Sequence, residues 1–207
     1  MGLGTGSTVN YMLEELGKRI REERLKIAGI STSIQTTKLA IEYGIPLTTL
    51  SEHPKIDIAI DVADQVDSKL DLIKGMGGAL TKEKIVDGVA EILTIIVDES
   101  KVTQKLGLNQ VVPIEVIPFA LTPVMNRLEK LGEPSIRFSK DRKRYFQTEN
   151  GNYIIDVNFG AIEDAKRLES EIKMISGVVE NGLFVNMAKI VFIGNKNSVK
   201  KIEKRSK

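Results

Sequence analysis

The sequence predicts an α/β fold in which a parallel sheet covered by helices is followed by a smaller α+β domain. Helix and strand patterns alternate over the first two-thirds of the 207 residues. Such alternation is typical of a parallel sheet with helices on both faces. After Pro113 the order becomes strand, helix, two strands, helix and strand, which predicts a second domain of α+β type.

Regularly spaced hydrophobic residues define the predicted elements of the first domain. Val9, Met12, Leu13, Leu16 and Ile20 recur at the spacing of one helix face. Further along the chain we predict a strand at 27–30, a helix at 36–43, a strand at 56–60, a helix at 80–90 and a strand at 92–97. The last of these is a continuous apolar run, which is typical of a strand buried on both faces.

The second domain is predicted from its turns as much as from its apolar runs. We expect a strand at 114–117, a helix at 121–131, extended runs on either side of 149–152, a helix at 162–175 and strands at 178–185 and 189–193. Asn150-Gly151 is a strong hairpin pattern. We expect the final strand to return to the first sheet. The predicted domains are therefore 1–111 with 186–207, and 112–185.

Composition excludes several classes of function. The net charge is +2 and basic residues are spread along the chain, so no nucleic-acid footprint is present; the basic tail at 196–207 is predicted to be a solvated end. No apolar run approaches the roughly 18 residues of a membrane span. The absence of cysteine excludes disulfides and thiolate chemistry and suits the cytoplasm, and a single histidine, His53, argues against a zinc site.

Two hydroxyl-rich segments follow predicted strands or open predicted helices. Gly2 to Thr8 combines glycines with hydroxyls before the first helix, a pattern that fits either a phosphate-binding turn or a turn with Ser7 as N-cap. Ser31 to Ser33 follows the strand at 27–30 and lies at the ligand-binding edge of a parallel sheet. The structural alternative is that this second segment caps the helix at 36–43. Capping is the preferred interpretation of the segment taken alone.

The third polar segment is the most informative. Asp61 and Asp64 follow the strand at 56–60, and Lys74, a glycine run and Glu83 on the first turn of a helix come after them. Solvated loop charges are the structural alternative. Three glycines between 74 and 80 weaken that alternative, because loops without tight backbone demands rarely need so many.

With these residues in place, the chain resembles the ribose-5-phosphate isomerase A family over nearly its whole length. The matching segments are Gly2 to Thr8, Asp61 to Asp67, Leu72 to Lys84, Asp98 to Lys101, Val112 to Pro118, Asn150 to Tyr153 and Gly177 to Phe184. Each motif is modest alone, but their order and spacing are specific.

The resemblance implies a Rossmann-like domain with a ferredoxin-like α+β domain, in a homodimer or homotetramer. It implies interconversion of D-ribose 5-phosphate and D-ribulose 5-phosphate through a cis-enediol in the pentose phosphate pathway, in the cytoplasm, with a sugar phosphate as the partner and without cofactor or metal. Glu83 resembles the catalytic base, and Asp61, Asp64 and Lys74 resemble the other catalytic residues. The substrate-binding residues it implies are Gly4, Thr5, Gly6, Ser7, Thr8, Ser31, Thr32, Ser33, Gly75, Gly77, Gly78 and Lys101.

The sequence departs from the family pattern at Val62, Gln65 and Met76. Family members also have a helix and a strand before the glycine-rich turn, so we expect coding sequence upstream of Met1 and an interior strand missing from this chain. Two alternatives follow: a sugar-phosphate sensor, or an inactive subunit. A dinucleotide enzyme is excluded, because Ser7 stands where a G-x-G-x-x-G motif needs glycine.

Overall fold

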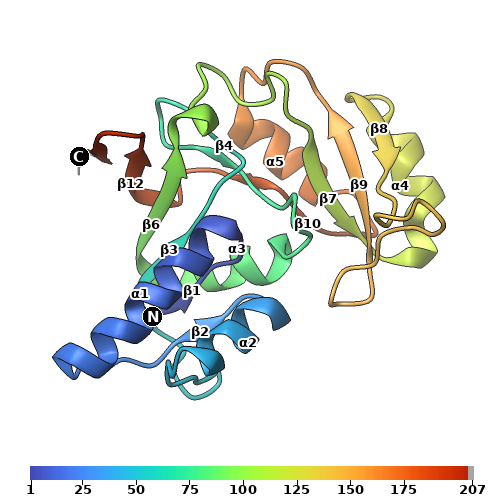
Figure 1. Cartoon of the computed structure of the whole chain (residues 1–207). Coiled ribbons are helices and arrows are strands. Elements are labelled where there is room, and N and C mark those ends of the chain that lie inside the picture. Colours follow the sequence, from blue (N-terminus) through green and yellow to red (C-terminus); the bar gives the residue numbers. More distant parts are fainter. Residues whose placement is uncertain (205–207) are drawn as a thin grey trace. The chain divides into compact units, whose positions relative to one another are not determined.

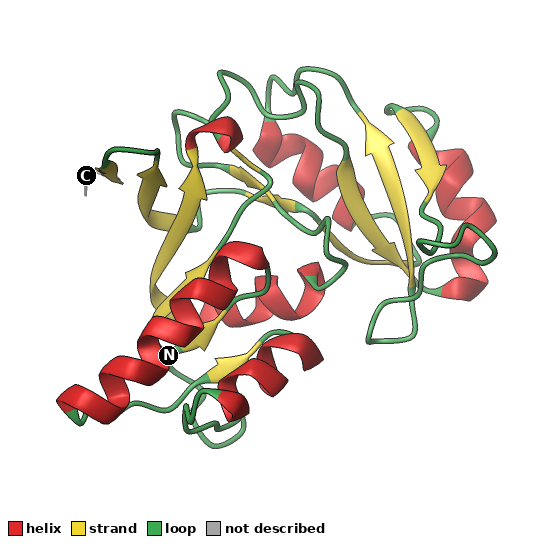
Figure 2. Ribbon diagram, in the orientation of Figure 1, coloured by secondary structure: helices red, strands yellow, loops and turns green. Residues whose placement is uncertain are grey.

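The computed structural model describes residues 1–204, which form two compact units (Figures 1 and 2). The first contains residues 1–63, 82–99 and the described part of 187–207; the second contains 64–81 and 100–186. The segments 64–81 and 100–111, which the sequence assigns to the first domain, fall in the second unit. Short strands at 65–66 and 72–73 form one sheet with the strand at 183–184, which explains why 64–81 falls in the second unit.

The first unit is built on a six-stranded sheet with the strand order β13-β12-β6-β3-β1-β2. Its strands are β1 (Gly2–Leu3), β2 (Ile30–Ser31), β3 (Ile56–Asp61), β6 (Ala90–Asp98), β12 (Ala188–Gly194) and β13 (Val199–Glu203). All neighbours are parallel except β12 and β13. The predicted return of the last apolar strand is confirmed, because β12 pairs with β6 (Figure 1).

Helices cover both faces of this sheet, as predicted. The helices are α1 (Ser7–Glu23), α2 (Ile34–Glu42) and α3 (Leu80–Val89), the last beginning in the second unit. Leu3 of β1 packs with Leu13 of α1 and Ala40 of α2, whereas a Cβ on Gly2 would lie 2.7 Å from Val86 of α3. Successive strand residues point to opposite faces, so α3 lies across the sheet from α1 and α2.

One expectation for the ends of this unit is wrong. Gly2 and Leu3 form strand β1 between β2 and β3, so the interior position that we expected to be vacant is filled. The described part of the basic tail is mostly exposed, as predicted, and Val199–Glu203 within it form β13 beside β12. Residues 205–207 of the tail lie outside the described residues.

The second unit contains the predicted ferredoxin-like arrangement. Its elements are β7 (Val112–Val116), α4 (Leu121–Leu128), β8 (Glu133–Ile136), β9 (Tyr153–Asn158), α5 (Ala165–Lys173) and β10 (Val178–Asn181), with the short 3₁₀ helix Pro118–Ala120. Another short 3₁₀ helix, Glu99–Lys101, begins in the first unit and ends in the second. The antiparallel sheet has the order β10-β7-β9-β8. Val124 and Leu128 of α4 and Ile172 of α5 share one buried cluster with Ile114 and Ile155 of the sheet.

A small three-stranded sheet in the same unit joins β4 (Gln65–Val66), β5 (Leu72–Ile73) and β11 (Leu183–Phe184). The predicted strand at 178–185 is therefore split into β10 and β11, which belong to different sheets. The break falls at Gly182, whose N–H donates to Pro113 O (2.7 Å) and whose carbonyl accepts from Lys74 N (2.9 Å). A side chain would not fit there, since a Cβ on Gly182 would lie 2.3 Å from Lys74 O.

The predicted hairpin turn is present, but only one flanking strand is regular. Thr148 N donates to Asn152 O (2.9 Å), and Gly151 has φ +81°. Strand β9 follows the turn. The segment before the turn forms only isolated bridges, such as the one between Gln147 and Tyr153. No helix within the described residues is long and apolar enough to cross a membrane.

Candidate active site

A cluster of hydroxyl groups lies in the first unit, where β1 and β2 end. Thr5 Oγ1 is hydrogen-bonded to Thr32 Oγ1 (2.8 Å), Ser33 Oγ (2.8 Å) and Thr36 Oγ1 (3.1 Å). Thr36 Oγ1 also donates to Gly4 O (2.8 Å). These bonds bring the two predicted hydroxyl segments together and fix the start of the glycine-rich turn.

The two helices that follow these segments begin differently. Ser33 Oγ accepts from Thr36 N (3.1 Å) and caps α2, so the capping interpretation of that segment is confirmed. Ser31 is half-buried and bonds Thr37 Oγ1 (2.6 Å). Helix α1 has Gly6 as its N-cap and no side-chain cap, so the alternative with Ser7 as N-cap is wrong.

Ser7 and Thr8 are exposed on the first turn of α1, where the backbone N–H groups have no side-chain cap. Gly6 has φ +151°, and a Cβ there would lie 2.8 Å from Val62 Cγ2. Val62 therefore packs against the turn, and it does not adopt a positive φ. An uncapped helix start with neighbouring hydroxyls is suited to binding an anionic oxygen.

Asp61 ends β3 beneath this turn and is fully buried. Its Oδ1 accepts from Thr5 N (3.2 Å) and Val62 N (2.7 Å). A Cβ on Gly4 would lie only 2.0 Å from the same oxygen. Glycine at position 4 is therefore what allows the carboxylate to approach the backbone of the turn.

Glu83 lies on the first turn of α3, as predicted, and its side chain is only 4% exposed. Asp87, one helical turn later, is 3% exposed. Residues four apart share a helix face, so α3 carries two buried carboxylates on one side. We did not predict a role for Asp87, although its spacing from Glu83 is visible in the sequence.

Lys74 is among the largest fully buried residues in the described part of the chain, with 1% exposed. It follows β5, and its Nζ lies 5.2 Å from the centroid of the Phe184 ring on β11. An ammonium group over an aromatic face is stabilised by the ring quadrupole. The small three-stranded sheet thus positions this lysine.

Asp64 lies in the second unit, near the predicted lysines. Its Oδ2 accepts from Met76 N (3.1 Å). Burial raises the pKa of Asp64, and the Met76 N–H and the positive charges of Lys74, Lys101 and Arg137 oppose that rise. Arg137 is a member of this group that sequence reasoning missed.

The glycine run forms a tight turn. Gly78 N donates to Gly75 O (3.0 Å), and Gly75 and Gly78 have φ +104° and +78°, which favour glycine. Met76 and Gly77 are exposed at its tip. The chain thus requires glycine at 75 and 78, while Met76 is accommodated between them.

Glu115 on β7 is a further buried carboxylate that sequence reasoning missed. It is fully buried, and Oε1 accepts from Thr148 Oγ1 (2.9 Å), Asn150 Nδ2 (3.0 Å) and Asn152 Nδ2 (2.8 Å). Thr81 donates to Oε2. The Asn150-Gly151-Asn152 motif, predicted only as a turn, therefore holds a carboxylate by neutral donors.

The predicted residues thus fall into two sets, with the glycine turn, hydroxyls, Asp61 and Glu83 in the first unit, and Asp64, Lys74, Gly75, Gly77, Gly78 and Lys101 in the second. The chain passes from one unit to the other after Ala63 and after Thr81. Within residues 1–204, no group of three or more histidine or acidic side chains is arranged to hold a metal ion.

Comparisons with known proteins show the family to which the chain belongs. The family model for ribose 5-phosphate isomerase A (phosphoriboisomerase A) matches residues 28–198. The ribose-5-phosphate isomerase A of Methanosarcina acetivorans is 48% identical over 208 residues, which cover 100% of this chain and 88% of that protein.

Solved structures are equally similar. The ribose 5-phosphate isomerase A of Methanocaldococcus jannaschii is 50% identical with a TM-score of 0.93, over 98% of this chain and 89% of the other. A D-ribose-5-phosphate isomerase in complex with phospho-erythronic acid is 42% identical with a TM-score of 0.95, over 98% and 89%. The chain therefore belongs to the ribose-5-phosphate isomerase A family.

Proposed function

We propose that the protein interconverts D-ribose 5-phosphate and D-ribulose 5-phosphate, with Glu83 as the catalytic base. The observation that carries this proposal is the nearly buried Glu83 carboxylate at the first turn of α3, in a chain of this family. Moving the carbonyl from C1 to C2 requires removal of a proton from C2 and its return at C1. One carboxylate above a planar enediol can perform both transfers.

Asp61 is proposed to assist opening of the cyclic sugar, with Asp64 as its helper. Ring opening needs proton transfer to and from sugar oxygens. Two backbone N–H groups hold one oxygen of Asp61, which fixes the orientation of its carboxylate. The raised pKa of Asp64 suits a group that exchanges protons.

Lys74 and the backbone of the glycine run are proposed to stabilise the enediolate oxygen. The negative charge that develops there is best met by donors fixed before the reaction begins. Lys74 is buried against Phe184, and the turn from Gly75 to Gly78 is closed by its own hydrogen bond. A related isomerase binds phospho-erythronic acid, whose planar carboxylate has the shape of an enediolate.

The phosphate group of the substrate is proposed to bind at the hydroxyl-rich segments and Lys101. Supporting this, the start of α1 has no side-chain cap and Ser7 and Thr8 are exposed. Thr5 hydrogen-bonds both Thr32 and Ser33, so we assign all three to shaping the turn as well as to binding. Fixing the phosphate orients C1 and C2 toward the base.

We further propose that the protein works as a homo-oligomer in the cytoplasm. The absence of cysteine suits a reducing compartment, and the family resemblance implies a dimer or tetramer. Light scattering of the purified protein gives its mass directly, and a monomeric mass would reject the oligomer. The sensor and inactive-subunit alternatives receive no support from the comparisons.

The deciding experiment measures ribose 5-phosphate turnover with a metal chelator present. We expect the wild-type protein to be active and Glu83→Gln to lower kcat by roughly 10²–10⁴-fold, the usual contribution of general acid–base catalysis. Glu91→Gln is the matched control, because Glu91 is exposed on β6. Binding without turnover in the wild type would reject the enzyme, and normal turnover in Glu83→Gln would remove Glu83 from the base role.

A further inference from the structure

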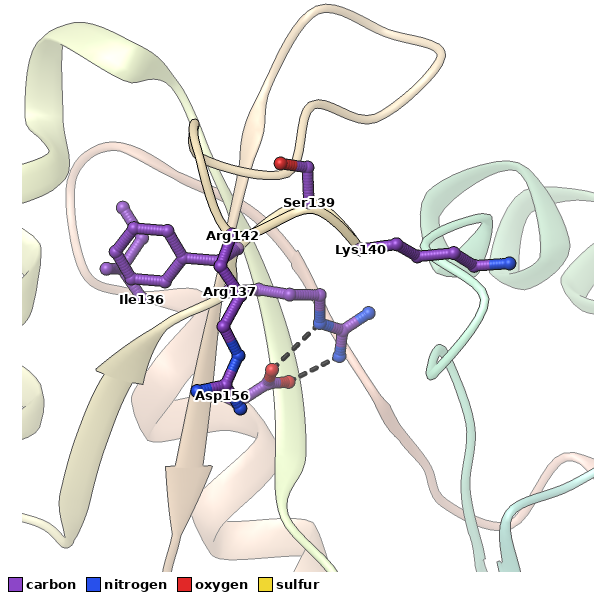
Figure 3. Close-up of a pocket in the computed structure, with 7 residues that line it drawn as sticks. Ile136, Arg137, Ser139, Lys140, Arg142 and Asp156 are labelled. Carbon is purple, nitrogen blue, oxygen red and sulfur yellow. Dashed lines mark hydrogen bonds and ion pairs between the residues drawn. The ribbon is translucent and has the colours of Figure 1, made fainter.

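We propose that Arg137, itself held by Asp156, is a positioning residue that orients the peptide groups of the turn at Gly75–Gly77. This rests on the roles proposed above for Asp64 and the glycine run. Arg137 directly follows β8 and lines a surface cavity of about 660 Å³ (Figure 3). Its side chain is 11% exposed, and that of its partner Asp156 on β9 is 15% exposed.

The guanidinium group reaches two successive carbonyls of the turn. Arg137 Nη1 donates to Gly75 O (3.1 Å) and to Met76 O (2.9 Å). Nε donates to Asp156 Oδ2 (2.8 Å), and Nη2 donates to Asp156 Oδ1, as Figure 3 shows. The bidentate bond to Asp156 fixes the plane of the guanidinium group and so fixes where the two carbonyls must lie.

The consequence for the turn follows from peptide geometry. In a trans peptide the C=O and N–H of one planar group point in opposite directions, and the described chain has no cis peptides. Gly75 O faces Arg137, so the N–H of the same peptide group, on Met76, faces away and meets Asp64 Oδ2 at 3.1 Å. Arg137 and Asp64 therefore hold opposite ends of one peptide group.

The next peptide group obeys the same rule. Because Met76 O also points to Arg137, the N–H of Gly77 is directed away from the guanidinium group. Successive N–H groups facing one side of a turn form a concave site for a negatively charged oxygen. Met76 N–H is already bonded to Asp64 Oδ2, so the donor that Arg137 orients for the proposed mechanism is the N–H of Gly77, and Arg137 does so without contacting substrate.

The cavity beside Arg137 suggests a different role, binding of an external anion, because Lys140 and Arg142 also line it (Figure 3). The donor count argues against that role. A guanidinium group has five N–H donors. Two point to the turn carbonyls, two to Asp156, and the last toward Met76 Sδ at 3.8 Å, so all five are engaged within the protein.

The charge of Arg137 adds a second effect on the same turn. It opposes the rise that burial causes in the pKa of Asp64. Loss of the guanidinium group would therefore leave Gly78 N–H as the donor to Gly75 O, loosen the Gly75–Met76 peptide and raise the pKa of Asp64 further. A merely structural contribution to stability would alter neither property.

The experiment compares Arg137→Ala, Arg137→Lys and Arg142→Ala by kinetics and by NMR. We expect Arg137→Ala to lower kcat by roughly 10–100-fold with KM changed less than about threefold, because a small displacement of catalytic donors costs this much. Guanidinium ion at concentrations below unfolding should restore part of kcat. Arg142→Ala, on the exposed loop of the same cavity, should keep wild-type kinetics.

Arg137→Lys keeps the positive charge but not the planar, bidentate guanidinium group, so it should fold and still have a lower kcat. This variant tests the proposal even if Arg137→Ala fails to fold. Independently of activity, the Met76 amide should exchange faster with solvent in both Arg137 variants, and the Asp64 carboxyl should titrate at higher pH in Arg137→Ala, which loses the positive charge. Unchanged Met76 exchange and kcat in Arg137→Lys would overturn this inference. An inactive wild-type protein with protected Met76 would instead refute only the proposed function.

Discussion

Thr81, on the first turn of helix α3, donates a hydrogen bond to the buried carboxylate of Glu115 on strand β7. Glu83 follows two residues later on the same turn. Because a helical turn is stiff, a bond that fixes Thr81 also restricts where the Glu83 backbone lies. The buried carboxylate thus serves as an anchor for the segment that carries the proposed base.

Removing the Thr81 hydroxyl should therefore reduce activity. We expect Thr81→Val to lower the free energy of unfolding by roughly 1–3 kcal/mol, since Glu115 loses a donor. We also expect kcat to fall by roughly tenfold, as displaced catalytic groups do. Thr81→Ser keeps the hydroxyl and should retain activity. Steady-state kinetics and urea unfolding measure both effects.

Thr148→Val is the control for this prediction. Thr148 donates to the same carboxylate (2.9 Å) but lies in the turn before β9, which carries no proposed catalytic residue. It should lose stability while kcat stays near the wild-type value. Equal losses of kcat in both valine variants would show that Glu115 acts on the whole fold and not on α3.

Replacing Gly4 and replacing Gly88 by alanine should change the stability of the fold in opposite directions. A Cβ on Gly4 would press on Asp61 Oδ1 and Cα, at 2.0 and 2.7 Å, so Gly4→Ala should cost roughly 1–3 kcal/mol of stability and most of the activity. Gly88 is exposed in α3, and its nearest contact would be Met187 Cε at 3.7 Å. Gly88→Ala should gain about 0.5–1 kcal/mol. Thermal unfolding of the two variants tests the contrast.

The Asp64 carboxyl should make stability depend on pH. Its pKa is raised from 3.8 by burial, so the folded protein binds this proton more tightly than the unfolded chain. Its contribution is therefore least favourable at neutral pH and improves as pH falls from the raised pKa to the ordinary one. Asp64→Asn, which keeps an acceptor for Met76 N–H, should be more stable than wild type at pH ~7 and equal to it below pH ~4.

Asp141 provides a control of opposite sign, measured by urea unfolding over the same pH series. A hydrogen bond from Ser139 lowers the pKa of this exposed carboxyl, so Asp141→Asn should lose a little stability at neutral pH. A gain from Asp64→Asn that is the same at acidic and neutral pH would contradict the assignment of the effect to ionisation.

Sequence patterns predicted the long elements well because those elements carry a full period of apolar residues. Helices α1 and α3 and strands β3, β6 and β12 all lie within a few residues of their predicted positions. β1 escaped prediction because Gly2 and Leu3 are too few to show alternation. β13 escaped because its residues are mostly polar and exposed, and only pairing with β12 makes them a strand.

The sequence predicted those site residues that can be recognised by their residue type and their spacing in the chain. Asp61, Lys74 and Glu83 are charged residues that prove to be buried, as expected of functional groups. Glu115 and Arg137 were missed because their partners lie far away in the chain; Glu115 bonds Thr148, and Arg137 bonds the turn at Gly75. No local pattern records such pairings, which exist only after the sheets form.

The end of the six-stranded sheet has a consequence for the protein at high concentration. β13 pairs with β12 from Gly194 with Val199 to Ile190 with Glu203, and it is the last strand on that side. An outermost strand with unpaired backbone groups can recruit a strand of another molecule and start aggregation. Lys200 and Lys201 are exposed on β13, and burying their charges against a neighbouring chain is costly. We therefore expect Lys200 and Lys201 of β13 to disfavour fibre-like self-association.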